Sequence, residues 1–389
     1  MNFTLTEEQL AAKEAARDFT QMELLPGVIE RDRDMKYPKE QVRKMGEMGF
    51  LGMMVNQEYS GGGMDTVSYV LAMEEISKVD SSCSVIMSVN NSLVCWGIET
   101  YCTEEQKRKY LPRLATGEWI GSFCLSEPEA GSDATSQRTT AVDMGDHYIL
   151  NGTKNWITNG GTSKLHLVMA QTHNELRHKG INAFIVEADW EGVSVGAKED
   201  KLGIRASDTH TIMYTDVKVP KENRIGEDGF GFKFAMKVLS GGRIGIAAQA
   251  LGIAAGAYEL AVKYAKEREA FGKPISQHQA IAFKLADMAT EIEAARLLVY
   301  RAAFMKDKGM DYTSAAAMAK LFASEVAMRH TVEAIQVHGG YGYVKEYHVE
   351  RLMRDAKITQ IYEGTSEMQR IVISRNILAG QLYEPILIS

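Results

Sequence analysis

The spacing of the apolar residues changes twice along the chain, and this change limits the folds that the sequence can adopt. In the first and last parts, apolar side chains recur every three or four positions, as on one face of an α-helix. In the middle part, short alternating segments are separated by glycine and polar turns, which is typical of a small antiparallel barrel or sandwich. We therefore predict a multidomain α and β protein, with an all-α N-terminal domain at residues 1–119, an antiparallel β-barrel at 120–230 and a C-terminal four-helix bundle at 231–389.

Local signals place helices in the first part of the chain. Thr6 precedes acidic residues and an apolar stripe, which is typical of a helix start. Helical spacing continues over residues 70–79, 83–101 and 104–114. The glycine run at 61–63 follows no strand, so we interpret it as a loop and not as a phosphate-binding turn.

The middle part contains a strong hairpin signal. Asn151-Gly152 lies between alternating apolar residues, and Asn-Gly favours the tight turn that joins two antiparallel strands. Further strands are predicted at residues 165–170, 181–186, 193–195 and 211–219.

Two wide stripes of small and apolar residues mark the last part, at residues 244–254 and 283–298. Stripes of this width bury more than one helix face, as in a four-helix bundle or a subunit interface. The most apolar stretch, residues 244–258, is interrupted by Gln249 and is shorter than the roughly 20 apolar residues that a bilayer requires, so we expect no membrane span.

Composition excludes several classes of function. The net charge of −7 over 389 residues argues against nucleic acid as the main partner. Four cysteines occur without a CxxC pair or zinc spacing, and the histidines form no HExxH arrangement, so we predict buried free thiols and no metal. The N-terminus lacks the basic start and apolar run of a secretory signal, so we do not expect secretion.

The turn around Glu363 is the candidate catalytic feature. Helical spacing precedes it, and Ser366 with Gln369 has the spacing of a capping box that starts the next helix. Gly364 lets another molecule approach the backbone closely, and free N–H groups at a helix start can meet a polarised carbonyl. A carboxylate at this place is either a general base or a solvated turn residue.

The segment around Glu363 resembles the C-terminal signature of the acyl-CoA dehydrogenases, flavoenzymes that desaturate acyl-CoA thioesters; it reads Ile361-Tyr362-Glu363-Gly364-Thr365-Ser366-Glu367. The resemblance recurs at Leu125-Ser126-Glu127-Pro128, at Trp156-Ile157-Thr158-Asn159, and at residues 268–272 and 338–343. It therefore spans nearly the whole chain and implies the acyl-CoA dehydrogenase fold, FAD as cofactor and Glu363 as the catalytic base.

The resemblance also assigns residues to FAD. Trp156 would stack on the flavin ring, Thr158 would donate its hydroxyl to the ring nitrogen that receives hydride, and Arg268 would reach the pyrophosphate of a neighbouring subunit's FAD. The full implied set is Phe123, Leu125, Ser126, Gly131, Ser132, Trp156, Ile157, Thr158, Arg268, Phe271, Gln279, Gln336, Val337, His338, Gly339, Gly340, Thr365, Ser366 and Glu367.

The implied substrate-binding residues are Ser132, Ser240, Arg243 and Gly364. Two positions near Arg243 depart from some relatives. Short-chain relatives often carry aspartate where this chain has Ser240, and some relatives take their base from the position of Gly242. Glu363 is therefore the base that the motifs of this chain offer.

The resemblance implies a short-chain, butyryl-CoA type dehydrogenase that forms the trans-2-enoyl-CoA, with an electron-transfer flavoprotein as acceptor and a homotetrameric assembly. The expected location is the cytoplasm of a bacterium, or the mitochondrial matrix for a processed eukaryotic chain. Open alternatives are a dehydrogenase for branched, aromatic or dicarboxylic acyl-CoA, an acyl-CoA oxidase, and a catalytically silent flavoprotein that serves as an electron-transfer scaffold. Along residues 85–96, Met87 and Trp96 are the candidates to close the acyl pocket.

Overall fold

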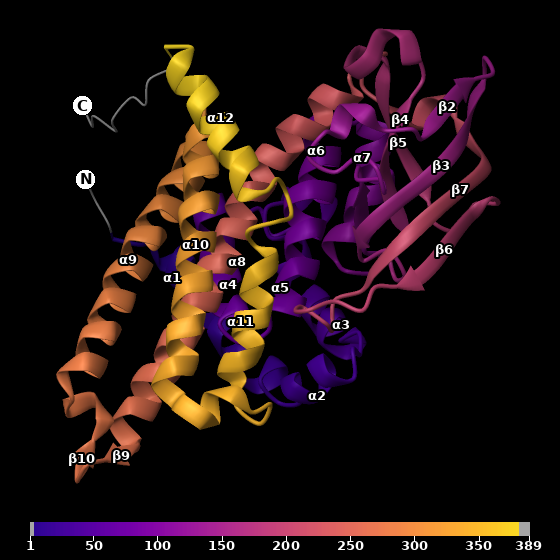
Figure 1. The fold of residues 1–389 in the computed structure, drawn as a ribbon. Helices are drawn as coiled ribbons and strands as arrows, with labels where there is room; N and C mark the ends of the chain where they lie inside the picture. The colour runs from indigo at the N-terminus through magenta and orange to yellow at the C-terminus, as the bar shows by residue number, and fades with distance from the viewer. Residues whose placement is uncertain (1–3, 381–389) are drawn as a thin grey trace.

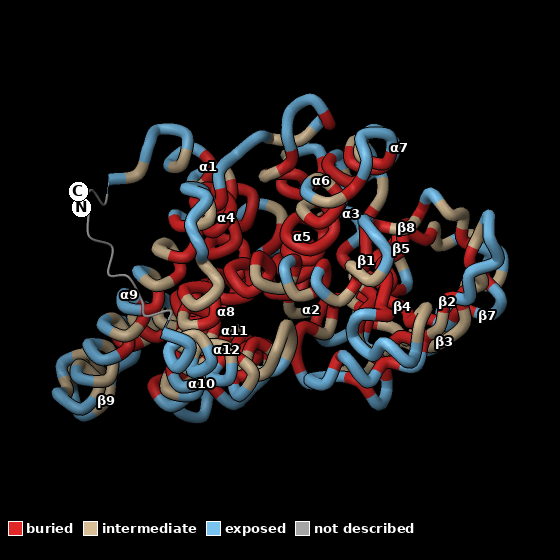
Figure 2. The backbone as a smooth tube through the Cα atoms, turned by 90° about the horizontal axis from the view of Figure 1, so that it is seen from above, coloured by how far each residue is buried: buried red, intermediate tan, exposed pale blue. Residues whose placement is uncertain are grey.

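The computed structural model describes residues 4–380, which form an N-terminal helical domain, a middle β domain and a C-terminal helical domain (Figure 1). The sheet lies on one side of the molecule, and part of the N-terminal helical domain lies between it and the long C-terminal helices (Figure 1). Buried residues run continuously through the helical interior and into the sheet (Figure 2).

The N-terminal helices confirm the helical prediction for this part of the chain. Thr6 caps the first helix through a capping box with Gln9. The helices are α1 (Glu7–Phe19), α2 (Val28–Arg33), α3 (Lys39–Glu47), α4 (Thr66–Ser77), α5 (Ser81–Ser88), α6 (Trp96–Tyr101) and α7 (Glu104–Ala115). A π-helical segment, Val89–Cys95, joins α5 to α6. The four cysteines are buried and free, as predicted.

The β domain is a mixed sheet in the order β6-β7-β3-β2-β4-β5-β8, with β1 paired to β4. Its strands are β1 (Gly121–Cys124), β2 (Thr140–Asp143), β3 (His147–Thr158), β4 (Leu165–Gln171), β5 (Ile181–Glu187), β6 (Val193–Lys198), β7 (Thr209–Pro220) and β8 (Arg224–Ile225). The prediction of an antiparallel barrel is wrong for two pairings, because β1 and β2 both run parallel to β4, and a closed barrel is not shown. β1 pairs with the first half of β4 and β2 pairs with its last residue. The loop that joins β1 to β2, residues 125–139, therefore lies outside the sheet.

The predicted hairpin at Asn151-Gly152 is also wrong. Both residues lie inside β3, at a register shift against β7, and the turn that joins β2 to β3 is at residues 144–146. The side chain of Asn151 exchanges hydrogen bonds with Asp216 on the neighbouring strand, at 2.9 and 2.8 Å. A Cβ at Gly152 would overlap Thr139, so this glycine serves close packing inside a strand and not a turn.

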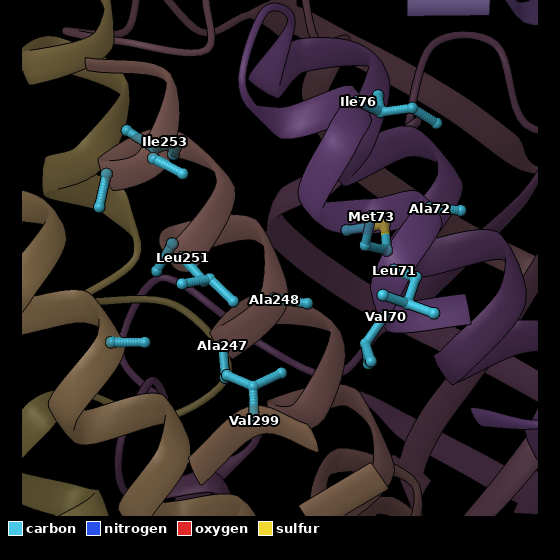
Figure 3. Close-up of a cluster of buried hydrophobic side chains, with 14 of the residues drawn as sticks. Val70, Leu71, Ala72, Met73, Ile76, Ala247, Ala248, Leu251, Ile253 and Val299 are labelled. Carbon is cyan, nitrogen blue, oxygen red and sulfur yellow. The ribbon is translucent and has the colours of Figure 1, made fainter. Parts of the chain in front are cut away.

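The C-terminal domain contains three long helices and two shorter ones. They are α8 (Gly231–Glu267), α9 (Gln279–Asp307), α10 (Thr313–His338), α11 (His348–Ile358) and α12 (Ser366–Leu378), with a small hairpin of β9 (Glu269–Ala270) and β10 (Lys273–Pro274) after α8. α4 packs on α8, where Val70, Leu71 and Met73 face the alanines of α8 (Figure 3). A Cβ at Gly252 would overlap the Glu74 carbonyl, which shows how closely these two helices approach.

Among residues 4–380, α8 alone is long and apolar enough to cross a membrane by length and composition. Residues 244–258, the apolar stretch noted in the sequence, are part of this helix of 37 residues. In its most apolar window, however, 83% of the residues are buried inside the protein. The apolar character of α8 is that of a core helix packed against α4, α9 and α10.

Candidate active site

One cavity brings together four parts of the chain: the π-helical segment, the 125–139 loop with the end of β3, the first turns of α8, and the turn between α11 and α12. Its lining residues are Val89, Leu93, Phe123, Leu125, Ser126, Gly131, Ser132, Ala134, Trp156, Thr158, Met236, Leu239, Arg243, Tyr362, Glu363, Gly364 and Met368. Phe123, Leu125, Ser126, Gly131, Ser132, Trp156, Thr158, Arg243, Glu363 and Gly364 were predicted as site residues from the sequence.

The turn that carries Glu363 has an unusual backbone. Glu363 and Gly364 have φ angles of 52° and 92°, in the left-handed region that most side chains avoid. The Gly364 carbonyl accepts two hydrogen bonds of 2.7 Å, from Nζ of Lys320 on α10 and from Nε2 of Gln369 on α12. These two donors hold the turn against the helices on either side.

The predicted capping box at Ser366 is wrong by one residue. The N-cap of α12 is Thr365, whose hydroxyl accepts a hydrogen bond from the Met368 N–H. The amide of Gln369 does not return to the cap, because it donates to the carbonyls of the turn instead. Neither Thr365, the buried Ser366 nor the exposed Glu367 lines the cavity.

The carboxyl group of Glu363 points into the cavity with one oxygen, Oε2, shielded from solvent and without a hydrogen-bond partner among residues 4–380. Burial raises the pKa of Glu363 to about 7, and the positive charges of Lys320 and Arg243 partly oppose this rise. A Cβ added at Gly242 would overlap Oε2. The position that carries the base in some relatives thus lies directly beside the carboxylate of this chain.

Trp156 and Thr158 lie at the end of β3. The alternation of β3 predicts that they share a face, yet a register shift separates Lys154 from Ile157 and Trp156 has a φ of 57°. Both nevertheless line the cavity, where Trp156 is 54% exposed. Ile157, the residue between them, is buried in the core of the β domain and does not line the cavity.

A buried ion pair fixes the 125–139 loop, and sequence reasoning missed it. Nζ of Lys154 donates to Oε1 of Glu127 at 2.7 Å and to the Leu125 carbonyl at 3.1 Å. Glu127 also accepts from the backbone N–H groups of Arg138 and Thr139, so both ends of the loop are tied to one carboxylate. The signal available in the sequence was a lysine inside an apolar strand, which is costly to bury without a partner.

The other predicted cofactor residues lie elsewhere. A second cavity is lined by Tyr264, Arg268, Ile275, Val337, His338, Gly339, Gly340, Tyr341 and Val344, and it shares no residue with the first. The Arg268 guanidinium lies 5.6 Å from the centre of the Tyr341 ring. Phe271 is 96% exposed at the tip of the β9–β10 hairpin, and Gln279 and Gln336 are exposed without lining either cavity.

Three further predicted positions do not meet the cavity. The Ser240 hydroxyl donates to the Met236 carbonyl at 3.0 Å and does not line the cavity. Met87 is fully buried in the helical core, and Trp96 packs edge-on against Tyr101. Val89 and Leu93, which lie on the same helical segment, occupy the cavity wall instead.

Among residues 4–380, no group of three or more His, Cys, Asp or Glu side chains is arranged to hold a metal ion. The site therefore consists of one buried carboxylate, two nearby cations, an exposed indole, hydroxyl groups and an apolar wall. Such a set suits proton abstraction next to a flat aromatic group.

Three known domain families match the sequence of this chain. The acyl-CoA dehydrogenase N-terminal domain matches residues 6–118, the middle domain matches residues 122–217 and the C-terminal domain matches residues 229–378. The chain belongs to the acyl-CoA dehydrogenase family. It is a FAD-dependent oxidoreductase, as are family members, one of which has been solved with FADH2.

Individual relatives show which members of the family this chain is similar to. A short-chain specific acyl-CoA dehydrogenase from Clostridium acetobutylicum is 51% identical over 97% of this chain and 100% of its own length. The butyryl-CoA dehydrogenase structure from Megasphaera elsdenii has a TM-score of 0.96 at 48% identity, covering 97% of this chain and all of that one. A chain solved in work on the electron transferring flavoprotein of Acidaminococcus fermentans has a TM-score of 0.96 at 52% identity, with the same coverage.

Proposed function

We propose that this chain is a short-chain acyl-CoA dehydrogenase in which the Glu363 carboxylate removes the α-proton of the thioester, giving the trans-2-enoyl-CoA. One observation carries the proposal: Glu363, whose carboxyl group has one oxygen without a hydrogen-bond partner among residues 4–380, lines the same cavity as the exposed indole of Trp156. With a pKa of about 7, this carboxylate is a stronger base than an ordinary glutamate and is still substantially ionised at neutral pH.

Other residues of the cavity that Glu363 lines fit the flavin ring of FAD. The exposed indole of Trp156 offers a flat stacking surface, Thr158 offers a hydroxyl beside it, and Phe123 and Leu125 complete an apolar wall. When FAD is bound, it supplies the acceptor for the hydride that leaves the β-carbon. Removal of the α-proton leaves enolate-like charge on the thioester oxygen, and we assign the backbone N–H of Glu363 as one of its donors.

The acyl chain is assigned to the apolar part of the cavity, formed by Val89, Leu93, Met236 and Leu239. The Acidaminococcus fermentans relative supports an electron-transfer flavoprotein as the partner that reoxidises the reduced enzyme. Reduction of the enzyme by a panel of acyl-CoAs without oxygen, followed by admission of air, tests both parts of the assignment. Bleaching of the flavin by short straight-chain thioesters and slow reoxidation in air are expected, whereas fast reoxidation would identify an oxidase.

Activity is expected to peak at about four carbons and then fall, because we assign the closed end of the acyl pocket to Val89 and Leu93 of the cavity wall. Each methylene that fits adds about 0.8 kcal/mol of burial, and one that does not fit meets this wall. Leu93→Ala should therefore extend the tolerated chain length, whereas Met87→Ala, a control outside the cavity, should not. The measurement is kcat/KM across straight-chain acyl-CoAs. A wild-type optimum at eight carbons or beyond would contradict the short-chain assignment.

Arg268→Ala is expected to weaken retention of FAD about tenfold or more, because the arginine is assigned to the pyrophosphate of a neighbouring subunit's cofactor in a homotetramer. Arg268 lines the second cavity, which shares no residue with the Glu363 cavity. Lys266→Ala is the matched control, since Lys266 is an exposed cation two positions earlier that does not line this cavity. FAD content is measured together with sedimentation velocity. A monomer that retains its FAD fully would contradict the assignment.

A further inference from the structure

Lys320 is a buried cation that the proposed reaction does not yet explain. It lies in an alanine-rich stretch of α10 and its side chain is completely buried. Its ammonium group donates to the Gly364 carbonyl at 2.7 Å, and it forms no ion pair with any residue from 4 to 380. A buried lysine without a paired carboxylate is expensive to keep charged, so its presence calls for a reason.

We propose that Lys320 is a positioning residue for Glu363: it anchors the turn that carries the carboxylate and supplies a nearby positive charge that favours the ionised base. The inference rests on the proposed role of Glu363 as the base. Lys320 touches neither the cavity nor the carboxylate directly, and therefore acts through the turn and through the field of its charge.

The anchoring part of the inference follows from the hydrogen bonds of the turn. Two consecutive residues with left-handed backbone persist only where their surroundings hold them. The Gly364 carbonyl is held from α10 by Lys320 and from α12 by Gln369, each at 2.7 Å. Loss of the Lys320 donor leaves the Gly364 carbonyl with the hydrogen bond from Gln369 alone, so the neighbouring Glu363 carboxylate is held less firmly.

The electrostatic part follows from the charged groups around the turn. Glu363 experiences two cations, Arg243 from α8 and Lys320 from α10, and both oppose the effect of burial on its pKa. Lys320 in turn experiences Glu363, Arg243, Glu367 and Glu325, while burial lowers its pKa to about 7. Arg243 stays charged over the working range, so Lys320 is the cation whose protonation can change there.

Three variants separate the two parts. Lys320→Met removes both donor and charge, Lys320→Gln keeps a donor without the charge, and Lys320→Arg keeps both. The Glu363 carboxyl is titrated in the FAD-loaded protein by its infrared C=O band, which is identified because it is lost in Glu363→Gln. Flavin reduction by a short acyl-CoA is followed over the same pH range. Lys320→Met and Lys320→Gln should raise the midpoint of the Glu363 titration by about one pH unit or more. Lys320→Arg should keep this midpoint at the wild-type value.

The Met variant should also reduce flavin more slowly than the Gln variant at high pH, where Glu363 is ionised in both. The inference would be overturned if both variants had the same Glu363 titration midpoint and the same limiting rate of flavin reduction as the wild type. If Lys320→Met does not fold, the titration midpoint of Lys320→Gln decides. Failure of the proposed function has a different signature. In that case the wild type is not reduced by any acyl-CoA, while the infrared titration still measures the coupling of Lys320 to Glu363.

Discussion

Glu363→Gln is expected to slow the reduction of bound FAD by acyl-CoA by about 10²- to 10⁴-fold or more, because the amide keeps the shape of the side chain but cannot accept the α-proton. The substitution introduces no new charge into a site where Oε2 has no hydrogen-bond partner within residues 4–380. FAD content and binding of acyl-CoA should therefore stay close to those of the wild type. The rate is measured by rapid mixing without oxygen.

Glu14→Gln is the control for this experiment. Glu14 is an exposed carboxylate on α1, and it lines neither cavity. Its loss should leave the rate of flavin reduction unchanged. Near wild-type reduction by Glu363→Gln, with full FAD content, would show that another group removes the proton.

Gly242→Ala is expected to lower kcat by about 10²-fold, because it displaces the base while the fold is preserved. The added Cβ would overlap Oε2 of Glu363 and would lie 2.5 Å from Cδ2 of Leu93. Both atoms are the ends of side chains, so the carboxylate moves rather than the helix. In a helix interior alanine is about 1 kcal/mol more favourable than glycine, so the thermal stability of the variant should not collapse.

The neighbouring glycine provides the control. A Cβ at Gly241 would have its nearest neighbour, the Tyr312 hydroxyl, at 3.7 Å, which is ordinary contact. Gly241→Ala should therefore keep kcat and gain slightly in stability. If both variants had the same kcat, the position of the Glu363 carboxylate beside Gly242 would not matter for the reaction.

Most elements were predicted from apolar segments that end at glycine and polar turns. The strands at residues 165–170 and 181–186 are buried on both faces, and α8 is buried on more than one face, so these segments are apolar almost throughout. The pairing of strands was harder to predict, because the parallel contacts of β1 and β2 with β4 depend on a loop that leaves the sheet. The hairpin predicted at Asn151-Gly152 was wrong for a related reason, because a strand bulge and a hairpin turn use the same residue types.

The site was predictable where its residues lie in consecutive motifs, as Glu363 and Trp156 do. Contacts that depend on packing between distant helices were not. Lys320 precedes Gly364 by 44 positions and meets it only because α10 packs beside the turn. Leu93 and Met236 reach the same cavity from different domains, and apolar side chains of this kind carry no sequence signal that separates a cavity wall from a core.

The pH dependence of flavin reduction tests the central claim, that Glu363 is the base, most directly. The second-order rate constant for reduction by a short acyl-CoA reports the ionisation of groups in the free enzyme. Because the base acts in its ionised form and burial raises its pKa to about 7, this constant should rise about tenfold per pH unit at low pH and level off above about pH 7. A rate constant that shows no inflection near neutrality, or one whose inflection persists in Glu363→Gln, would contradict the account.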